Sequence, residues 1–400
     1  MDIKIFPSKL DGVVEAVSNK AHAWRVFLAS ILSKDKTEIY LKTPFEEIKN
    51  LISILKSLSY AVSQTDCDYT VAPCELDKKA VEIDVGDNAV SLKFIAPVLC
   101  ALGVNFKASL GEKLRKKIKP DDFYCIKGVE PVKRGANISF IGKLIAGEYN
   151  AKDISSSYLL SAIMMSLAIV DGNSKIVCDN DIKNKIYFKQ TLAVMKDFGV
   201  DVELVDDGVL IKGGQKYIAK SKMVVEGDYY ASAFIMGANV FGNRVRITGL
   251  NPESVQTDKK IRDYLLSFNA KGTTLDLTNN QDLVYILAVV SCFAFSNTTI
   301  KGINLTGKEG ETLNAFVSVL NKLGATLSIE NEQLKIEGKA GLKGGAMVDS
   351  FGDYRIAMAI SLAGTVADEP ITVLSAHAVN KIYPNFFNDF KTLGGICQAF

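Results

Sequence analysis

The sequence is poor in the residues that usually build metal sites and disulfide frameworks. It has only two histidines, His22 and His377, and its seven cysteines are odd in number, unevenly spaced and without a CxxC pair. A zinc site and a disulfide framework are therefore not expected, and the thiols are typical of reduced, incidental cysteines. With so few histidines, a His-based metal site is not expected either.

Long apolar runs and a large excess of one charge are also missing. The longest apolar stretches, 158–170 and 283–295, contain serine and span 13 residues each, too few to cross a bilayer. The 47 basic and 45 acidic residues leave a formal net charge of +2, whereas nucleic-acid and membrane partners usually select a basic excess. We expect a cytoplasmic monomer without a nucleic-acid or membrane partner.

Several common catalytic signatures are absent too. The chain has no GxGxxG after a strand, no GxxxxGK[ST], no GxSxG and no HExxH. These absences remove the usual signs of a dinucleotide enzyme, a P-loop nucleotidase, a serine hydrolase and a zinc protease.

What the chain does contain indicates a folded α/β protein of two domains. Its 400 residues exceed one ordinary core, and 48% of them are hydrophobic. A unit that closes a helix and opens a strand recurs along the sequence, which predicts a repeat-built fold, although a doubly wound sheet fits the alternation equally well. Left-handed helix ends are expected at Gly103, Gly199, Asn269, Gly324 and Gly394, with Ser59 as a weaker copy.

Two helices can be predicted in more detail. Residues 43–58 carry an apolar stripe, and Thr43 and Pro44 suit the N-cap and the first helical position. Residues 311–323 carry a second stripe that ends before Gly324.

Lysines, arginines and carboxylates lie beside small residues at element ends over the whole chain. This distribution suits a site that binds phosphates and carboxylates between two domains.

Ten segments, read in chain order, resemble motifs of the 5-enolpyruvylshikimate-3-phosphate (EPSP) synthase family. The two most specific are DSFGDYRIAMAISLAG (349–364), which resembles GDHRIAMA, and NKIYPNFFNDFKTLG (380–394), which resembles the C-terminal Lys-x-Tyr/Phe-Pro segment. SNKAHAWRVFLASIL (18–32) carries the opening lysine and arginine, and NLTGKEGETLNAF (304–316) carries Asn-x-x-x-Lys-Glu. The other six segments are 86–103, 113–120, 147–165, 184–200, 225–238 and 280–290.

The resemblance implies the α/β (α+β) fold of the two-domain enolpyruvyl transferases. Each domain would be an inside-out α/β barrel of three βαβαββ repeats. Residues 16–225 would form the first domain, and residues 1–15 with 226–400 the second, with the active site in the cleft between them. The implied reaction transfers the enolpyruvyl group of phosphoenolpyruvate (PEP) to the 5-hydroxyl of shikimate 3-phosphate and releases phosphate, with no metal or organic cofactor.

The resemblance also implies a role for each matched residue. Those expected to bind shikimate 3-phosphate are Lys20, Arg25, Ser156, Ser157, Tyr187, Asp282, Asn304 and Lys308. Those expected to bind PEP are Lys119, Arg355 and Lys381. The expected catalytic residues are Asp282 and Glu309 for proton transfer, with Lys20 or Lys381 as proton donors.

Simpler structural roles fit some of the same residues. Lys119 lies in a basic run and suits a solvated surface charge. Asp282, Ser156 and Ser157 suit helix caps, and Tyr187 suits a core position.

The chain departs from the family pattern mainly where PEP would bind. Val90 replaces a glycine, Lys119 replaces an arginine, and Thr312 replaces the arginine of Lys-Glu-x-x-Arg. Four further departures are Ala21, Tyr158, Asn184 and Tyr354.

Two interpretations stay open: a working EPSP synthase with weak affinity for PEP and for glyphosate, or a catalytically impaired or re-purposed paralogue that binds a shikimate-like or other anionic ligand. The related enzyme that uses UDP-N-acetylglucosamine fits less well, because Cys125 lacks the glycines that flank the active-site cysteine of that enzyme.

Overall fold

The computed structural model describes residues 1–400 except 75, 77–80, 220–221, 269–271 and 339–340. The chain divides into two compact units, each with its own hydrophobic core. Unit 1 comprises Met1–Val17 and Gly227–Phe400, and unit 2 comprises Ser18–Glu226. Within the described residues, no helix is both long and apolar enough to cross a membrane.

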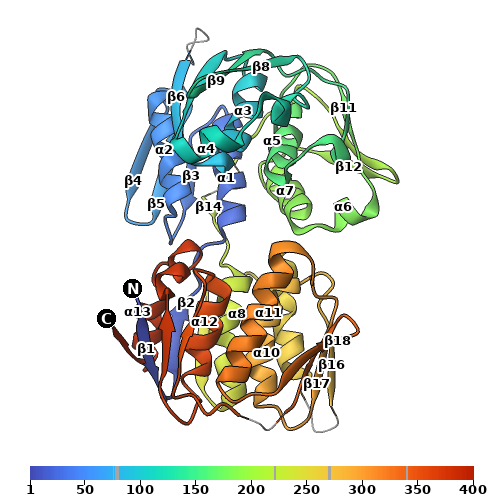
Figure 1. Ribbon diagram of the computed structural model, residues 1–400. Helices are drawn as coiled ribbons and strands as arrows, with labels where there is room; N and C mark the ends of the chain where they lie inside the picture. Colours follow the sequence, from blue (N-terminus) through green and yellow to red (C-terminus); the bar gives the residue numbers. More distant parts are fainter. Residues whose placement is uncertain (75, 77–80, 220–221, 269–271, 339–340) are drawn as a thin grey trace. The chain divides into compact units, whose positions relative to one another are not determined.

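Unit 2 holds three four-stranded sheets with the same strand-pairing pattern (Figure 1). In each sheet a parallel pair of strands is extended by an antiparallel hairpin. The first sheet has the order β14 (Met223–Val224), β3 (Thr37–Tyr40), β5 (Asp68–Ala72), β4 (Ala61–Thr65). The second has the order β6 (Val81–Gly86), β7 (Phe106–Leu110), β9 (Asn137–Gly142), β8 (Val129–Arg134). The third has the order β10 (Glu148–Asn150), β11 (Ser174–Val177), β13 (Gly208–Ile211), β12 (Val202–Val205).

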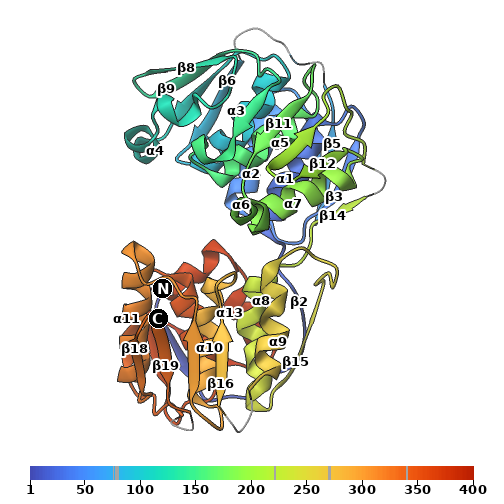
Figure 2. The same cartoon turned by 90° about the vertical axis from the view of Figure 1, so that its right-hand side faces the viewer.

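The three most buried helices of unit 2 lie between these sheets, as Figures 1 and 2 show. α1 (Lys20–Leu32), α3 (Ala89–Ala101) and α5 (Ser157–Leu167) are buried over almost their whole circumference, which explains why their sequences lack a polar face. The amphipathic helices are α2 (Glu46–Ser57) and α7 (Ile186–Asp197). The short helices are α4 (Glu112–Lys117), η1 (Pro120–Phe123), η2 (Ala151–Asp153) and α6 (Asn180–Asn184).

Unit 1 repeats this pairing pattern in two four-stranded sheets. One has the order β16 (Thr273–Asp276), β17 (Thr298–Lys301), β19 (Gln333–Ile336), β18 (Leu327–Glu330). The other has the order β20 (Met347–Asp349), β21 (Ile371–Leu374), β1 (Ile3–Phe6), β22 (Ile396–Ala399). Because β1 pairs antiparallel with both β21 and β22, the first strand of the chain completes its last repeat.

The third sheet of unit 1 is shorter than the expected βαβαββ pattern. It holds only β2 (Asp11–Glu15) and β15 (Arg244–Thr248), which run parallel. The hairpin expected between β15 and β16 is absent from the described residues, because that segment is taken up by η4 (Thr257–Lys260), α9 (Ile261–Leu266) and their loops. The other helices of unit 1 are α8 (Tyr229–Met236), η3 (Gly237–Phe241), η5 (Gln281–Leu283), α10 (Val284–Cys292), α11 (Gly307–Lys322), α12 (Tyr354–Ala363), η6 (Ala376–Lys381) and α13 (Phe386–Thr392).

The expected helix ends are confirmed where they are described. Positive φ angles occur at all four predicted glycines and at Ser59, whose φ is +66°. Asn269 lies outside the described residues. The predicted start of the helix at Thr43 was wrong, since α2 begins at Glu46. The Thr43 amide donates to the Ser18 hydroxyl at 3.3 Å instead, which ties this residue to the start of α1.

Candidate functional site

Arg355 is the centre of a charged cluster in unit 1. It lies in the first turn of α12, and its side chain is only 9% exposed. Its Nη1 bonds Asp282 Oδ1 at 2.8 Å and Glu309 Oε2 at 2.5 Å, while Nη2 bonds Asp353 Oδ2 at 2.8 Å. Three motifs far apart in the sequence therefore meet at one guanidinium.

The electrostatics of this cluster favour a permanent charge on Arg355. Burial opposes that charge, but the hydrogen bonds that Arg355 donates to the Asp353 and Glu309 carboxylates raise the pKa of Arg355 above its ordinary value. The guanidinium also lies over the Tyr285 ring, 4.8 Å from the centroid. Three carboxylates around one cation leave the cluster with net negative charge, which opposes the binding of an anionic ligand at Arg355.

Asp282 and Glu309 present their carboxylates from two different helical elements. Asp282 lies in η5, directly before the buried helix α10, and Glu309 lies in the first turn of α11. Their side chains are 56% and 49% exposed, so both can reach solvent or a ligand. The alternative that Asp282 caps α10 was wrong, because the N-cap of α10 is Leu283 and the Asp282 carboxylate bonds Arg355.

The sequence interpretation missed Asp353, the third carboxylate. Its side chain accepts the Arg355 amide at 2.8 Å as the N-cap of α12, and it also accepts from Nε of Arg355 at 3.0 Å. The signal was available, since an aspartate directly before an apolar helical run is a common cap. Its second role as a partner of the guanidinium becomes visible only in the fold.

Lys381 lies close to the same turn of the chain. Its Nζ donates to the carbonyl of Gly352 at 2.8 Å, and Gly352 immediately precedes Asp353. The side chain comes from the end of η6, in an exposed position. Lys381 and Arg355 therefore flank the same loop between β20 and α12.

The remaining predicted residues of unit 1 lie at the start of α11. The side-chain oxygen of Asn304 accepts the amide and the hydroxyl of Thr306, at 3.0 and 2.9 Å. Lys308 is exposed in the first turn, where Glu309 also lies. One turn further along, Thr312 occupies the position at which the family pattern has an arginine.

In unit 2, Arg25 is buried at the meeting point of three helices. It lies in α1 and is 1% exposed. Its Nε donates to Thr191 Oγ1 at 2.9 Å, and Nη2 donates to Ser161 Oγ at 2.8 Å and to the Tyr187 carbonyl at 3.1 Å. Nη1 donates to the carbonyl of Ala21 at 2.7 Å. These bonds join α1 to α5 and α7 and leave one of the five N–H groups without a partner among the described residues.

Burial without a neighbouring carboxylate partner lowers the pKa of Arg25 to about 10, although Tyr158 acts to raise it. The group still carries a charge at neutral pH. Phe94 lies beside the guanidinium, 5.8 Å from it, and the Tyr158 ring packs on Phe94 at 5.5 Å. Tyr158, which stands where the family has glutamine, is 40% exposed and forms part of the aromatic cover of Arg25.

Lys20 has a partner that the sequence did not reveal. Its ammonium forms a close ion pair with Glu47 of α2 and lies 5.7 Å from the centroid of Phe45. The Lys20 side chain is 30% exposed, so it remains within reach of a ligand.

The other predicted residues of unit 2 occupy mixed environments. Ser156 is the N-cap of α5 by position, but its side chain makes no capping hydrogen bond. Ser157 accepts the Ser161 hydroxyl at its carbonyl. Tyr187 is half-buried against the core, and burial raises the pKa of its hydroxyl. Lys119 is an exposed residue directly before η1.

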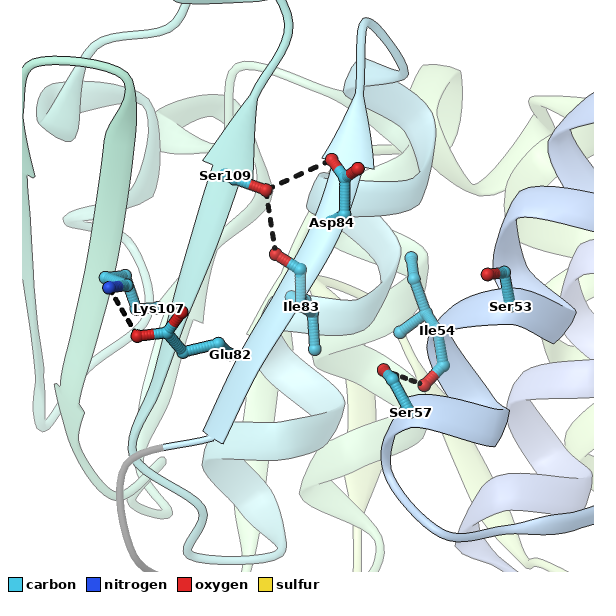
Figure 3. Close-up of a pocket in the computed structure, with 8 residues that line it drawn as sticks. All are labelled: Ser53, Ile54, Ser57, Glu82, Ile83, Asp84, Lys107 and Ser109. Carbon is cyan, nitrogen blue, oxygen red and sulfur yellow. Dashed lines mark hydrogen bonds and ion pairs between the residues drawn. The ribbon is translucent and has the colours of Figure 1, made fainter.

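Two cavities of unit 2 lie away from these residues. One, of about 290 Å³, lies between α2 and the β6–β7 pair and is shown in Figure 3. Four of its polar side chains are paired with one another, since Ser109 donates to Asp84 at 3.1 Å and Lys107 pairs with Glu82. The other, of about 680 Å³, adjoins the ends of α1 and α3 at Leu32 and Leu102. No predicted site residue lines either cavity.

Comparison with known proteins gives a consistent family. Residues 136–390 match the family model for EPSP synthase (3-phosphoshikimate 1-carboxyvinyltransferase). The 3-phosphoshikimate 1-carboxyvinyltransferase of Clostridium novyi is 32% identical, over 99% of this chain and 98% of that protein. The enzyme of the same name from Clostridioides difficile is 29% identical, over 98% and 97%.

The solved structures show the same fold. EPSP synthase from Acinetobacter baumannii aligns over 100% of both chains with a TM-score of 0.84 at 17% identity. The enolpyruvyl transferase NikO from Streptomyces tendae aligns over 99% of this chain and 98% of its own, with a TM-score of 0.76 at 15% identity. The two-domain enolpyruvyl transferase fold expected from the sequence is confirmed.

Proposed function

Because this chain belongs to the EPSP synthase family, we propose that it transfers the enolpyruvyl group of PEP to the 5-hydroxyl of shikimate 3-phosphate and releases phosphate. The observation that supports this most directly is the junction of Asp282, Glu309 and Arg355. It brings together the two carboxylates and the PEP-binding arginine that the sequence motifs predicted separately.

The proposed chemistry needs proton transfer at two places. The acceptor hydroxyl loses a proton as its oxygen bonds to PEP. The PEP methylene carbon gains a proton in that addition and loses one when phosphate leaves. We assign these transfers to Asp282 and Glu309, whose carboxylates are half exposed and meet at one nitrogen of Arg355. Lys20 and Lys381 are the proposed proton donors.

The proposed PEP ligands are Arg355, Lys381 and Lys119. Arginine matches a carboxylate or phosphate in two-pronged geometry, whereas lysine acts as a point charge. Asp282 and Glu309 hold the Arg355 guanidinium before PEP arrives. We therefore propose that PEP binding releases at least one of these two carboxylates for proton transfer.

The proposed shikimate 3-phosphate ligands are Lys20, Arg25, Ser156, Ser157, Tyr187, Asn304 and Lys308, together with Asp282. Ser156 supports this assignment because its side chain makes no capping bond at the start of α5. Arg25 contributes mainly by joining α1, α5 and α7, with one N–H left for the ligand. Lys20 has to leave Glu47 or share it in order to bind an anion.

A second candidate function is binding of an anionic ligand without enolpyruvyl transfer. It is favoured by the environment of the PEP residues: the Arg355 guanidinium already bonds three carboxylates, and Thr312 supplies no positive charge. Such a protein would bind shikimate 3-phosphate in calorimetry and leave PEP unchanged.

A coupled measurement separates the two functions. The protein is mixed with PEP and shikimate 3-phosphate, phosphate release is followed, and the enolpyruvyl product is identified by mass. We expect both products in equal amounts, and a strong loss of both in Arg355→Lys. Arg246→Lys, an exposed arginine of β15, is the matched control and should keep full activity. Binding of shikimate 3-phosphate without phosphate release would instead establish the second function.

A further inference from the structure

Asp258 is a carboxyl group of unit 1 that no predicted role uses. It lies in η4, and its Oδ1 accepts a hydrogen bond from Nδ2 of Asn280 at 3.2 Å. Asn280 is 3% exposed and stands two residues before Asp282. The Asn280 carbonyl accepts the Leu283 amide at 3.0 Å. Asn280 thus links Asp258 to the short helix that presents Asp282 to Arg355.

Like charges surround this link. Burial raises the pKa of Asp258 to about 7, with Asp228 and Asp282 acting in the same direction and the Asn280 hydrogen bond acting against them. Asp228 is buried at the N-cap of α8, and Asp282 comes from η5. An ionised Asp258 would therefore be the third negative charge among these elements.

Two buried polar atoms near Asp258 have no partner among the described residues. One is the Tyr230 hydroxyl, on a side chain that is 8% exposed, and the other is Oδ1 of Asn280. Burial, then Tyr354, Asp282 and Asp258 raise the pKa of Tyr230 well above its ordinary value, so its hydroxyl keeps its proton. An unpaired buried donor is costly. Here the donor is the Tyr230 hydroxyl, and both Asp258 and Asp282 interact with it electrostatically.

We propose that Asp258 is a positioning residue whose carboxyl oxygen holds Asn280, and thereby the η5 segment, so that Asp282 stays on Arg355. The proposal rests on the proposed function, because it concerns the placement of the PEP-binding arginine and a proton-transfer carboxylate. Loss of the Asp258 proton adds a negative charge beside Asp228 and Asp282, and this charge repels an incoming anion.

Other charged and titratable groups lie on the same helical element as Asp258 and on the neighbouring helices. Lys259 and Lys260 lie in η4, and Lys259 donates to the carbonyl of Pro252 at 3.1 Å. The remaining groups are Arg262 and Tyr264 of α9, and Tyr354 and Arg355 of α12. Within this group, the change expected near neutral pH is that of Asp258, whose pKa burial raises to about 7.

The kinetic test compares the full chain with Asp258→Asn between pH 6 and 9. In the wild type we expect the KM for PEP to rise above pH 7, toward the limit of ~10-fold per pH unit for one ionisation, with a smaller change in kcat. Asp258→Asn is neutral at every pH, and its KM should lack this rise. The matched control, Asp263→Asn, removes an exposed carboxylate of α9 and should follow the wild type. An unchanged rise in Asp258→Asn would overturn the proposal.

A second measurement needs no turnover. Aspartate carboxyl carbons are labelled with ¹³C in the full chain without ligand, and the Asp258 signal is identified by its absence in Asp258→Asn. A midpoint near pH 7 is expected, and a midpoint near pH 4 would overturn the proposal. PEP affinity from calorimetry at pH 6 and 8 replaces KM if the protein has no turnover. PEP binding that is weaker at pH 8 than at pH 6 in the wild type, but not in Asp258→Asn, would then support this inference even though the proposed function fails.

Discussion

The hydroxyl of Thr312 donates to the carbonyl of Lys308, one helical turn earlier, at 2.9 Å. The residue that stands where the family pattern has an arginine is thus turned back onto its own helix. A threonine in this geometry supplies no positive charge and has its donor in use. The proposed PEP site therefore has one positive charge fewer than the family pattern provides, and we expect it to bind PEP more weakly.

Restoring that arginine should tighten PEP binding. We expect Thr312→Arg to lower the KM for PEP, and Thr312→Arg with Val90→Gly to lower it further, because the Val90 side chain fills volume that the family leaves to a small anion. A charge-assisted bond contributes roughly 1.5–3 kcal/mol, so a ~10-fold or larger gain is expected for the double variant. Steady-state kinetics at varied PEP would measure it, and inhibition by glyphosate should strengthen in parallel.

The control for this series is Val90→Gly alone. Val90 is half-buried against the core of unit 2 in the first turn of α3, so glycine should cost about 1 kcal/mol of stability there. A wild type that already binds PEP at low micromolar concentration, with no gain in the double variant, would contradict the prediction.

Arg25 should matter for both stability and acceptor binding. Arg25→Ala removes hydrogen bonds to α5 and α7 in a buried position, and we expect a lower melting temperature together with loss of roughly 1.5–3 kcal/mol of shikimate 3-phosphate affinity. Arg25→Lys keeps the charge but not the fork of donors, so it should be intermediate in both. Calorimetry at a temperature where each variant is folded separates affinity from stability, and unchanged affinity would remove Arg25 from the acceptor site.

The two carboxylates proposed for proton transfer, Asp282 and Glu309, should be needed for turnover more than for folding. Asp282→Asn and Glu309→Gln each keep a hydrogen-bonding group beside Arg355, and we expect turnover to fall by roughly 10²–10⁴-fold with KM values little changed. Glu311→Gln, an exposed neighbour in α11, is the control and should stay near wild type. Near-normal turnover of Asp282→Asn would exclude this residue from proton transfer.

The buried His22 side chain should lower the free energy of unfolding in acid. Its Nδ1 accepts the Glu226 amide at 3.1 Å, and burial lowers the pKa of His22 to about 4, with Glu226 acting to raise it and Arg25 to lower it. The unfolded chain takes up this proton near the ordinary pKa of 6.5 and the folded chain only near 4, so stability should fall as pH drops from 6.5 to 4. The contribution is at most about 3 kcal/mol.

This acid sensitivity can be isolated because the chain has only two histidines. His22→Asn should flatten the pH dependence of the unfolding free energy between pH 4 and 6.5, whereas His377→Asn, at an exposed position, should not. Titration of the His377→Asn variant by proton NMR leaves one imidazole signal to follow. A midpoint above pH 6 for that signal would refute the assignment.

Much of the fold could be predicted from the sequence because its signals are local. Left-handed helix ends follow from Gly103, Gly199, Gly324 and Gly394, whose φ angles lie between +74° and +101°. Apolar stretches such as 283–295 predicted buried helices, and α10 is buried along its whole length. The predicted start of α2 at Thr43 was wrong because this residue makes a contact that is not local. The Thr43 amide donates to the hydroxyl of Ser18, a residue 25 positions away.

The sequence by itself determined which residue types are available and where helices end, because backbone preference and burial act over a few neighbouring residues. Only the tertiary structure decided which charges meet: Lys20 with Glu47, Arg355 with Asp282, Glu309 and Asp353, and Asp258 with Asn280. Most of these partners lie 22 to 73 positions apart in the chain. Their pairing depends on how α1 packs with α2 in unit 2 and how η4, η5, α11 and α12 pack in unit 1, and no local pattern encodes that packing.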